Sequence, residues 1–162
     1  MSATVSLRPA RPTDLEALLD LLALLFAIEE DFAFDATCQR RALAMMLEAD
    51  DAVVLVAEAA NRVIGMCSGQ LTLSTAEGGP ALLVEDVVVA SPWQGRGVGR
   101  QLMTALEQWA GARKIGRLQL LADRTNSAAL EFYKRCGWQG TELICLRKRL
   151  PVARAERRPE SC

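Results

Sequence analysis

The 162-residue chain has no histidine and a single tyrosine, Tyr133. The absence of histidine excludes nucleophilic catalysis that depends on a Ser-His or Cys-His pair, and it removes the histidine ligands of most zinc sites. The five cysteines are odd in number, scattered, and form no Cys-x-x-Cys pair, which favours reduced thiols in a cytoplasm. We therefore expect no metal site, and we interpret the cysteines as core or surface residues: Cys38, Cys67, Cys136, Cys145 and Cys162.

Strong net charge and long apolar runs are also absent. The formal net charge of −1 gives no general attraction to nucleic acid. No uncharged apolar run reaches the roughly 18 residues of a membrane span, and the N-terminus lacks the basic and apolar regions of a signal peptide. The composition, 51% hydrophobic and 24% charged, is that of an ordinary globular protein. We expect one domain over residues 1–150 and a disordered tail over 151–162.

The most informative stretch runs from Val87 to Leu102. A β-branched run meets Ser-Pro, a loop with glycines at alternate positions follows, and an amphipathic helix begins. The first-turn amides of a helix have no internal partners, and the helix dipole places about half a positive charge there. Glycines leave no Cβ between those amides and a phosphate, and arginines add forked donors. The glycines are Gly95, Gly97 and Gly99, and the arginines are Arg96 and Arg100. The stretch therefore predicts an anion site.

The spacing of this loop narrows the kind of anion site. It matches neither a Walker A loop nor the G-x-G-x-x-G of a dinucleotide fold. A bare G-x-G-x-G also occurs in flexible turns. However, Gln94-x-x-Gly97-x-Gly99 resembles the Q/R-x-x-G-x-G/A pyrophosphate loop of the GNAT acyltransferase superfamily, which binds acetyl-coenzyme A (acetyl-CoA). A second stretch, Asn126 to Trp138, resembles the N-x-x-A-x-x-F-Y-x-x-x-G-F/W helix of the same family. The resemblance covers roughly residues 5–150.

The order of expected elements agrees with this resemblance. We expect strands at about 4–8, 52–59, 63–74, 82–89, 118–122 and, in one or two pieces, 138–150. We expect helices at about 13–28, 36–49, 97–113 and 126–136, with Thr13 and Glu16 forming a capping box and Gly65 and Gly69 marking bulges. This order predicts an α/β fold with a mixed sheet. The resemblance implies a mostly antiparallel central sheet of about six to seven strands, flanked by about four helices.

The resemblance also implies how acetyl-CoA is held. The backbone amides of the loop would wrap the pyrophosphate, and the preceding strand would pair with the pantetheine arm like an added strand. The Val89 N–H is then the expected oxyanion donor, because neighbouring strands separate there in the family. Asn126 is expected to cap its helix and to contact the cofactor arm. The cofactor residues are therefore Val87, Val88, Val89, Gln94, Gly95, Arg96, Gly97, Val98, Gly99, Arg100, Asn126 and Tyr133.

Six positions carry the expected chemistry. Tyr133 matches the family's general acid for the leaving thiolate, although a tyrosine packed in the core gives the same pattern. Glu85 and Asp86 interrupt an apolar strand, where alternation makes them face opposite ways. We expect Glu85 to be the base, directly or through water, and Asp86 to contact the acceptor. Asp86 is the alternative base, and pairing of the carboxylates with Arg or Lys is the other alternative. Glu29 and Glu30, with Asp31, either bind a cationic acceptor or form a solvated helix end.

The resemblance thus predicts an acetyl-CoA-dependent N-acetyltransferase that acts by direct attack in a ternary complex. The expected acceptor is the primary amine of a small molecule. A lysine or N-terminal acetyltransferase of proteins and a non-catalytic acyl-CoA sensor are the alternatives. We expect no nucleic-acid or membrane partner. Because members of this family are often dimers, a homodimer is also considered.

Overall fold

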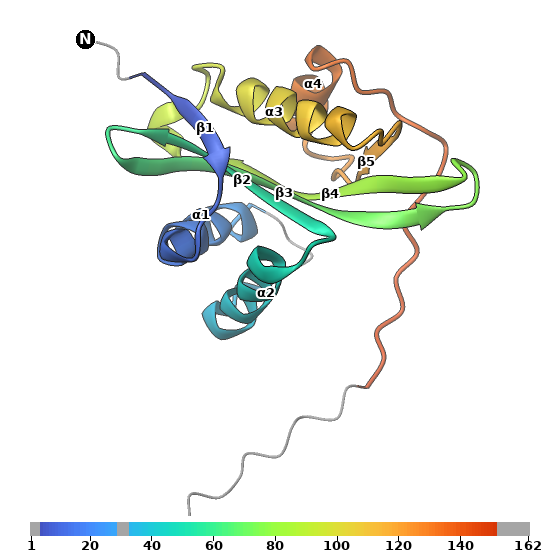
Figure 1. The fold of residues 1–162 in the computed structure, drawn as a ribbon, viewed down its shortest axis with the longest axis horizontal. Coiled ribbons are helices and arrows are strands. Elements are labelled where there is room, and N and C mark those ends of the chain that lie inside the picture. The colour runs from blue at the N-terminus through green and yellow to red at the C-terminus, as the bar shows by residue number, and fades with distance from the viewer. Residues whose placement is uncertain (1–3, 29–32, 152–162) are drawn as a thin grey trace, which may run out of the picture.

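The computed structural model of the chain describes residues 4–28 and 33–151. A five-stranded sheet lies between two layers of helices, with α1 and α2 on one face and α3 and α4 on the other (Figure 1). The strands are β1 (Ser6–Pro9), β2 (Ala52–Ala59), β3 (Arg62–Ser74), β4 (Gly79–Val89) and β5 (Leu118–Leu120). The helices are α1 (Leu15–Phe26), α2 (Ala36–Glu48), α3 (Val98–Ala112) and α4 (Ser127–Arg135), with short 3₁₀ turns η1 (Pro12–Asp14) and η2 (Ser91–Trp93). No described helix is long and apolar enough to cross a membrane.

The strands lie in the sheet in the same order as in the chain. The pairings β1–β2, β2–β3 and β3–β4 are antiparallel, whereas β4–β5 is parallel. A parallel pair needs a crossover, and α3 supplies it. The predicted α/β class and the mixed, mostly antiparallel sheet are therefore confirmed.

The sheet has fewer strands than predicted, because the C-terminal residues of the chain add none. Residues 138–150 form no strand, and four of their large apolar side chains are between 65% and 87% exposed: Leu143, Ile144, Leu146 and Leu150. A strand needs a paired edge as well as an apolar pattern, and within the described residues nothing pairs with the outer edge of β5. The described sheet therefore has five strands rather than six to seven.

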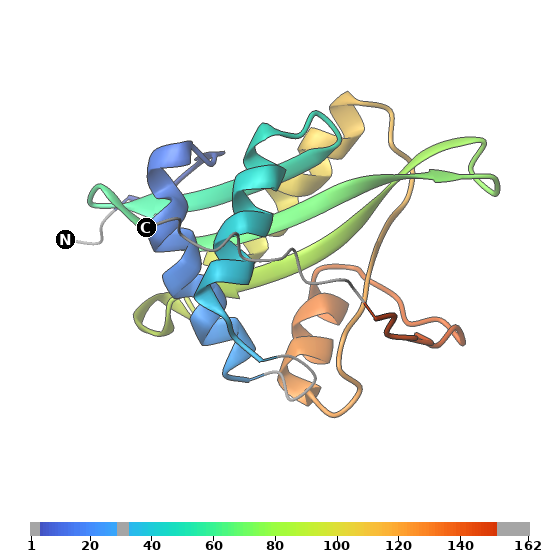
Figure 2. The same cartoon turned by 90° about the horizontal axis from the view of Figure 1, so that it is seen from below.

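Both faces of the sheet are covered, which explains the continuous apolar runs in its strands. Along β2, Val53 and Leu55 pack toward α3, whereas Val54 and Val56 pack toward α1 and α2. Figure 2 shows α1 and α2 lying side by side across this second face. The sheet is therefore packed between two apolar clusters, one under each layer of helices.

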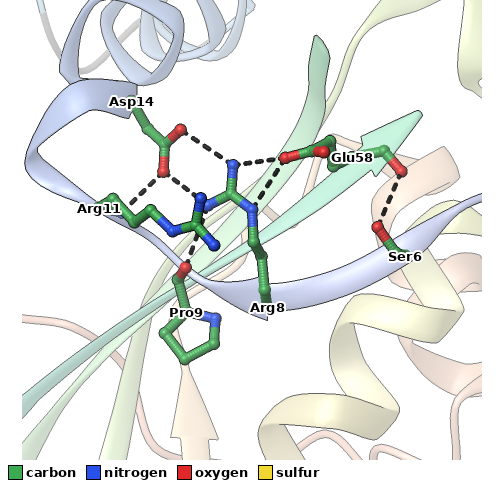
Figure 3. A network of polar contacts seen from close by, with 6 residues as sticks. All are labelled: Ser6, Arg8, Pro9, Arg11, Asp14 and Glu58. Carbon is green, nitrogen blue, oxygen red and sulfur yellow. Dashed lines mark hydrogen bonds and ion pairs between the residues drawn. The ribbon is translucent and has the colours of Figure 1, made fainter. Parts of the chain in front are cut away.

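The start of α1 differs from the predicted capping box. Helix α1 begins at Leu15 after a 3₁₀ turn, and the buried Asp14 carboxylate, not the Thr13 hydroxyl, accepts the Arg11 N–H at 2.7 Å. Arg8 on β1 holds the same carboxylate at 2.7 Å and the Glu58 carboxylate of β2 at 2.6 Å (Figure 3). The predicted Thr13 cap is therefore wrong, because Asp14 is drawn into an ion-pair network that joins both strands to the helix.

Glu16 does not return to the helix start as a capping box requires. Its carboxylate pairs instead with the Arg40 guanidinium of α2. This exposed pair links the two helices on one face of the sheet.

Candidate functional site

Strand β4 loses one of its two neighbours halfway along its length. The parallel pairing with β5 joins Leu82 to Leu118 and ends where Val84 meets Leu120. Beyond Val84, the pairing of β4 continues with β3 alone, as far as Val89. Within the described residues, the second half of β4 therefore has an open side where β5 has ended.

A bulge interrupts β4 at the point where β5 ends. Cys67 of β3 pairs with Val87 and Gly69 with Val84, so Ser68 lies opposite two residues, Glu85 and Asp86. Register shifts occur beside both Gly65 and Gly69, as predicted. The extra residue at the second shift lies in β4 itself.

The bulge reverses the alternation of side chains along β4. Before it, Leu82 and Val84 pack in the cluster under α3; after it, Val87 and Val89 pack there. Val88 packs in the cluster under α1 and α2. The two residues between Val84 and Val87 consequently both fall on the α1 and α2 face. The prediction that these two carboxylates face opposite ways is wrong, because two bulged residues occupy one step of the partner strand.

The same register orients the backbone at the end of β4. Ala90 N–H donates to the Ile64 carbonyl at 2.8 Å. In an antiparallel pair, alternate residues direct both backbone groups to the partner, so Val88 faces β3, and Val87 and Val89 face the open side. The Gln94 side-chain amide donates to the Val89 carbonyl at 2.9 Å. The N–H groups of the two valines thus point into the opening, and Gln94 ties the following loop to the strand.

The loop after β4 presents free amides beside this opening. Gly95 and Gly97 have φ of 72° and 80°, and no atom lies within 4 Å of the position that a Cβ would take on either. Gly97 is the N-cap of α3, so the amides of its first turn have no intrahelical acceptor. Arg96 and Arg100 are exposed on the same segment. This arrangement provides room and positive potential for an anion.

The third glycine of the loop lies against α4. A Cβ on Gly99 would lie 3.2 Å from two ring carbons of Phe132 and 3.8 Å from Val89. Gly99 therefore allows α4 to pack against the first turn of α3, and its missing side chain faces α4. The close approach brings the neighbour of Tyr133 to the end of β4.

Helix α4 carries the only tyrosine of the chain. Asn126 caps the helix as predicted, since its Oδ1 accepts the Ala129 N–H at 3.0 Å. Gly137 ends the helix at a φ of 88°. The half-buried Tyr133 ring stands between two aromatic rings, with centroid distances of 5.2 Å to Phe132 and 6.0 Å to Trp138. The ring is thus fixed by packing.

The two carboxylates at the bulge have no basic partner in the part of the chain that the structure describes. Within the described residues, neither Glu85 nor Asp86 forms an ion pair with Lys or Arg, so the predicted alternative of structural pairing is not found. Burial raises the pKa of both, Asp86 adds to the rise for Glu85, and the Ser68 hydrogen bond opposes it for Asp86. Two adjacent carboxylates without counter-ions favour a proton or a cationic ligand.

The structure does not describe three of the predicted acceptor-site residues, and it adds one residue that was not predicted. Glu29, Glu30 and Asp31 lie outside the described residues. Ser68 was not predicted, although a serine within the apolar run of β3 was the available signal. The structure therefore brings together the β4 end, the loop, Gln94 and α4, with the carboxylates on the opposite face at the bulge.

Comparison with known proteins relates this arrangement to characterised folds. The family model for acetyltransferases of the GNAT family matches residues 15–138. An aminoglycoside N(6')-acetyltransferase type 1 of Stenotrophomonas maltophilia is 28% identical over 150 residues, which are 89% of this chain and 92% of that protein. N-alpha-acetyltransferase 80 of Mus musculus is 51% identical over 59 residues, 36% of this chain, and the match spans only 18% of that protein.

A solved structure has the same fold. The aminoglycoside N-acetyltransferase AAC(6')-Iy, in complex with CoA, superposes with a TM-score of 0.79 at 21% identity, over 93% of this chain and 98% of that one. The fold class implied by the two sequence motifs is therefore confirmed.

Proposed function

The chain belongs to the acetyltransferase (GNAT) family, and from that premise we propose that it transfers the acetyl group of acetyl-CoA to a primary amine of a small molecule. The open side of β4 beyond Val84 carries this proposal. It offers backbone donors next to an anion site, and acyl transfer from a thioester needs both. We propose residues 1–150 as one catalytic domain.

The donor substrate fits the residues around the opening. The pyrophosphate would lie against the first-turn amides of α3, where Gly95 and Gly97 leave the space that a Cβ would fill. The pantetheine arm would pair with the backbone of Val87 and Val89 in place of the missing strand. Loop and strand would act together, since the Gln94 side chain joins them. The other loop residues and the Asn126 side chain would complete this binding surface.

The transfer step uses three groups of this chain. The amine nitrogen attacks the thioester carbonyl, the C–N bond forms and the C–S bond breaks. The Val89 N–H would donate to the oxyanion, a contribution of typically ~10²–10³ in rate. Glu85 would take the amine proton, directly or through water. The Tyr133 hydroxyl would give its proton to the departing thiolate, because a phenol of pKa near 10 is protonated at neutral pH.

A base is needed because the acceptor is mostly protonated. An alkylamine of pKa about 10.4 is neutral in roughly one molecule per thousand at pH 7.4, which costs ~4 kcal/mol. The carboxylates at the bulge, without basic partners among the described residues, supply negative charge that attracts the ammonium form and accepts its proton. A small polycationic acceptor is supported by the relative of similar length, whose name states an aminoglycoside substrate.

A protein amine is a second candidate acceptor, favoured by the short stretch that is 51% identical to an N-alpha-acetyltransferase. A sensor that binds acyl-CoA without turnover is a third. The sensor needs neither a positioned tyrosine nor an unpaired carboxylate, so Tyr133 and Glu85 favour an enzyme. The cytoplasmic location and the homodimer stay predictions.

The first experiment measures thiol release from acetyl-CoA against a panel of amines: polyamines, aminoglycosides, amino acids and lysine peptides. Calorimetry of CoA binding runs beside it. We expect turnover with small polycationic amines, and turnover with lysine peptides alone would favour the second candidate. Binding without turnover would favour the sensor, and no binding would contradict the anion site.

The variant Tyr133→Phe separates enzyme from sensor in the same assays. Loss of a general acid commonly lowers the rate by ~10²–10⁴. We expect kcat to fall within that range while the Kd for CoA stays unchanged. An unaltered kcat would show that the thiolate receives its proton elsewhere.

A further inference from the structure

One buried polar side chain lies directly opposite the bulge. Ser68 of β3 is 0% exposed. Its hydroxyl donates to Asp86 Oδ2 at 2.6 Å and accepts the Asp86 backbone N–H at 3.2 Å. A hydroxyl has one proton to donate, and here the carboxylate receives it. Ser68 thus holds both the backbone and the side chain of Asp86 across the step where β4 carries its extra residue.

The adjacent carboxylate has no such support. Glu85 is more exposed than Asp86, and within the described residues its carboxylate forms no hydrogen bond or ion pair. The two neighbours on one face therefore differ in freedom, since Asp86 is fixed and Glu85 can change rotamer. A fixed carboxylate can hold a cation at one place, whereas the exposed Glu85 side chain can reach the amine nitrogen or a water bound to it.

We propose that Ser68 is a positioning residue of the acceptor site, which fixes the place of the Asp86 carboxylate that contacts the acceptor's ammonium group and leaves Glu85 to take the proton. This inference rests on the proposed acetyl transfer. It assigns different tasks to two carboxylates that are adjacent in sequence and share a face.

The geometry of the contact supports an ionised Asp86. An O–H···O distance of 2.6 Å lies in the range of hydrogen bonds to charged oxygen. A hydrogen bond to the charged form stabilises that form, which opposes the larger effect of burial on the pKa of this carboxylate. The bulge contributes as well, because without it Asp86 would alternate to the face under α3 and lose Ser68.

The test compares Ser68→Ala, Asp86→Asn and the double variant, using the best acceptor from the amine panel. We expect Ser68→Ala to lower kcat/KM by about 10- to 100-fold, the factor for losing one hydrogen bond to a charged group. The loss should appear as a higher KM for the amine, with the KM for acetyl-CoA unchanged. In the Asp86→Asn background, Ser68→Ala should have no further effect, because Ser68 acts through Asp86.

The matched control is Ser74→Ala on the same strand. Its hydroxyl also contacts a charged side chain, Arg117 Nη2 at 2.9 Å, but lies away from the bulge. Ser68→Cys tests the site without leaving a cavity, since a thiol is a weaker donor, and should fall between wild type and Ser68→Ala. Multiplicative losses in the double variant, or equal effects at Ser68 and Ser74, would overturn the proposal.

A second readout keeps this proposal separate from the proposed function. The ¹³C NMR titration of the Asp86 carboxyl carbon reports the contact whether or not any amine is acetylated. We expect Ser68→Ala to raise the titration midpoint of Asp86. An unchanged midpoint would overturn the role of Ser68 even in an active enzyme, whereas a raised midpoint without turnover would leave the contact established and refute only the acetyl transfer.

Discussion

Two glycines of α3 allow a sharp test of the packing between α3 and α4. A Cβ on Gly99 would lie 3.2 Å from the Phe132 ring, whereas no atom lies within 4 Å of the same position on Gly111. Gly111→Ala should stabilise the protein by about 0.5–1 kcal/mol, because alanine loses less backbone entropy in a helix. Gly99→Ala gains the same stabilisation, but its new methyl group overpacks the contact with the Phe132 ring. Such overpacking typically costs about 1–3 kcal/mol of stability.

We therefore expect Gly99→Ala to be net destabilising, by up to about 2 kcal/mol. The Phe132 ring has to move by a few tenths of an ångström, and Tyr133 follows it on the same helix. A misplacement of about 1 Å costs ~10²-fold in rate, so this smaller shift should lower kcat by less than that. Gly111→Ala, at the far end of the helix, should leave kcat unchanged.

Urea unfolding and the thiol-release assay check both parts. The double variant Gly99→Ala/Phe132→Leu removes the ring that meets the new methyl group, so it should lose less than the sum of the two single changes. The reasoning is refuted if Gly99→Ala stabilises the protein as much as Gly111→Ala does and leaves turnover intact.

Two further predictions concern titratable groups. The Arg8 ion pair lowers the pKa of Asp14, so this carboxylate stabilises the fold above its unfolded pKa of about 3.9 and loses that contribution as pH falls through the lower folded value. Asp14→Asn should lower the free energy of unfolding, measured in urea, by about 2–3 kcal/mol near neutral pH. It should also weaken the fall of that free energy as the pH is lowered. Parallel curves of stability against pH for the two proteins would contradict this. Burial and Asp86 raise the pKa of Glu85, so kcat/KM should rise with pH through that raised value. Glu85→Gln should remove this limb and lower kcat/KM by ~10²–10⁴, and an unchanged pH profile would mean that the base lies elsewhere.

Local signals in the sequence predicted the elements that carry the site. The Asn126 cap acts within a few residues of chain and is found as expected, and Gly137 ends the same helix with a positive φ. Gly95 and Gly97 adopt the left-handed conformations that a glycine loop permits. These features depend on backbone chemistry at the position itself, so one sequence suffices to predict them.

Features set by a distant partner were not predictable in this way. The tight contact at Gly99 depends on a phenylalanine 33 positions along the chain. The start of α1 depends on Arg8 and Glu58, which draw in Asp14 and leave Thr13 without the cap role. The expected strands over 138–150 had the right pattern but lack a paired edge. In each case tertiary contacts outweighed a correct local preference.

The carboxylate pair shows the same limit at the centre of the site. Gly69 marked the neighbourhood of a bulge, but nothing local stated which strand would hold the extra residue. Placing it in β4 rather than β3 changes the face of Asp86 and brings it to Ser68. Strict alternation therefore gave the wrong orientation for these two carboxylates, although the sequence already showed that they interrupt an apolar strand.

The extra residue in β4 also decides which changes of length this strand can accept. Deleting either Glu85 or Asp86 would leave a single residue opposite Ser68, while Val84 would still pair with Gly69 and Val87 with Cys67. The N–H groups of Val87 and Val89 would therefore keep their direction toward the opening, and the apolar faces of the strand end would be preserved. Variants of this chain that lose one of the two carboxylates by deletion should therefore keep the backbone of the coenzyme site and change only the charge beside it.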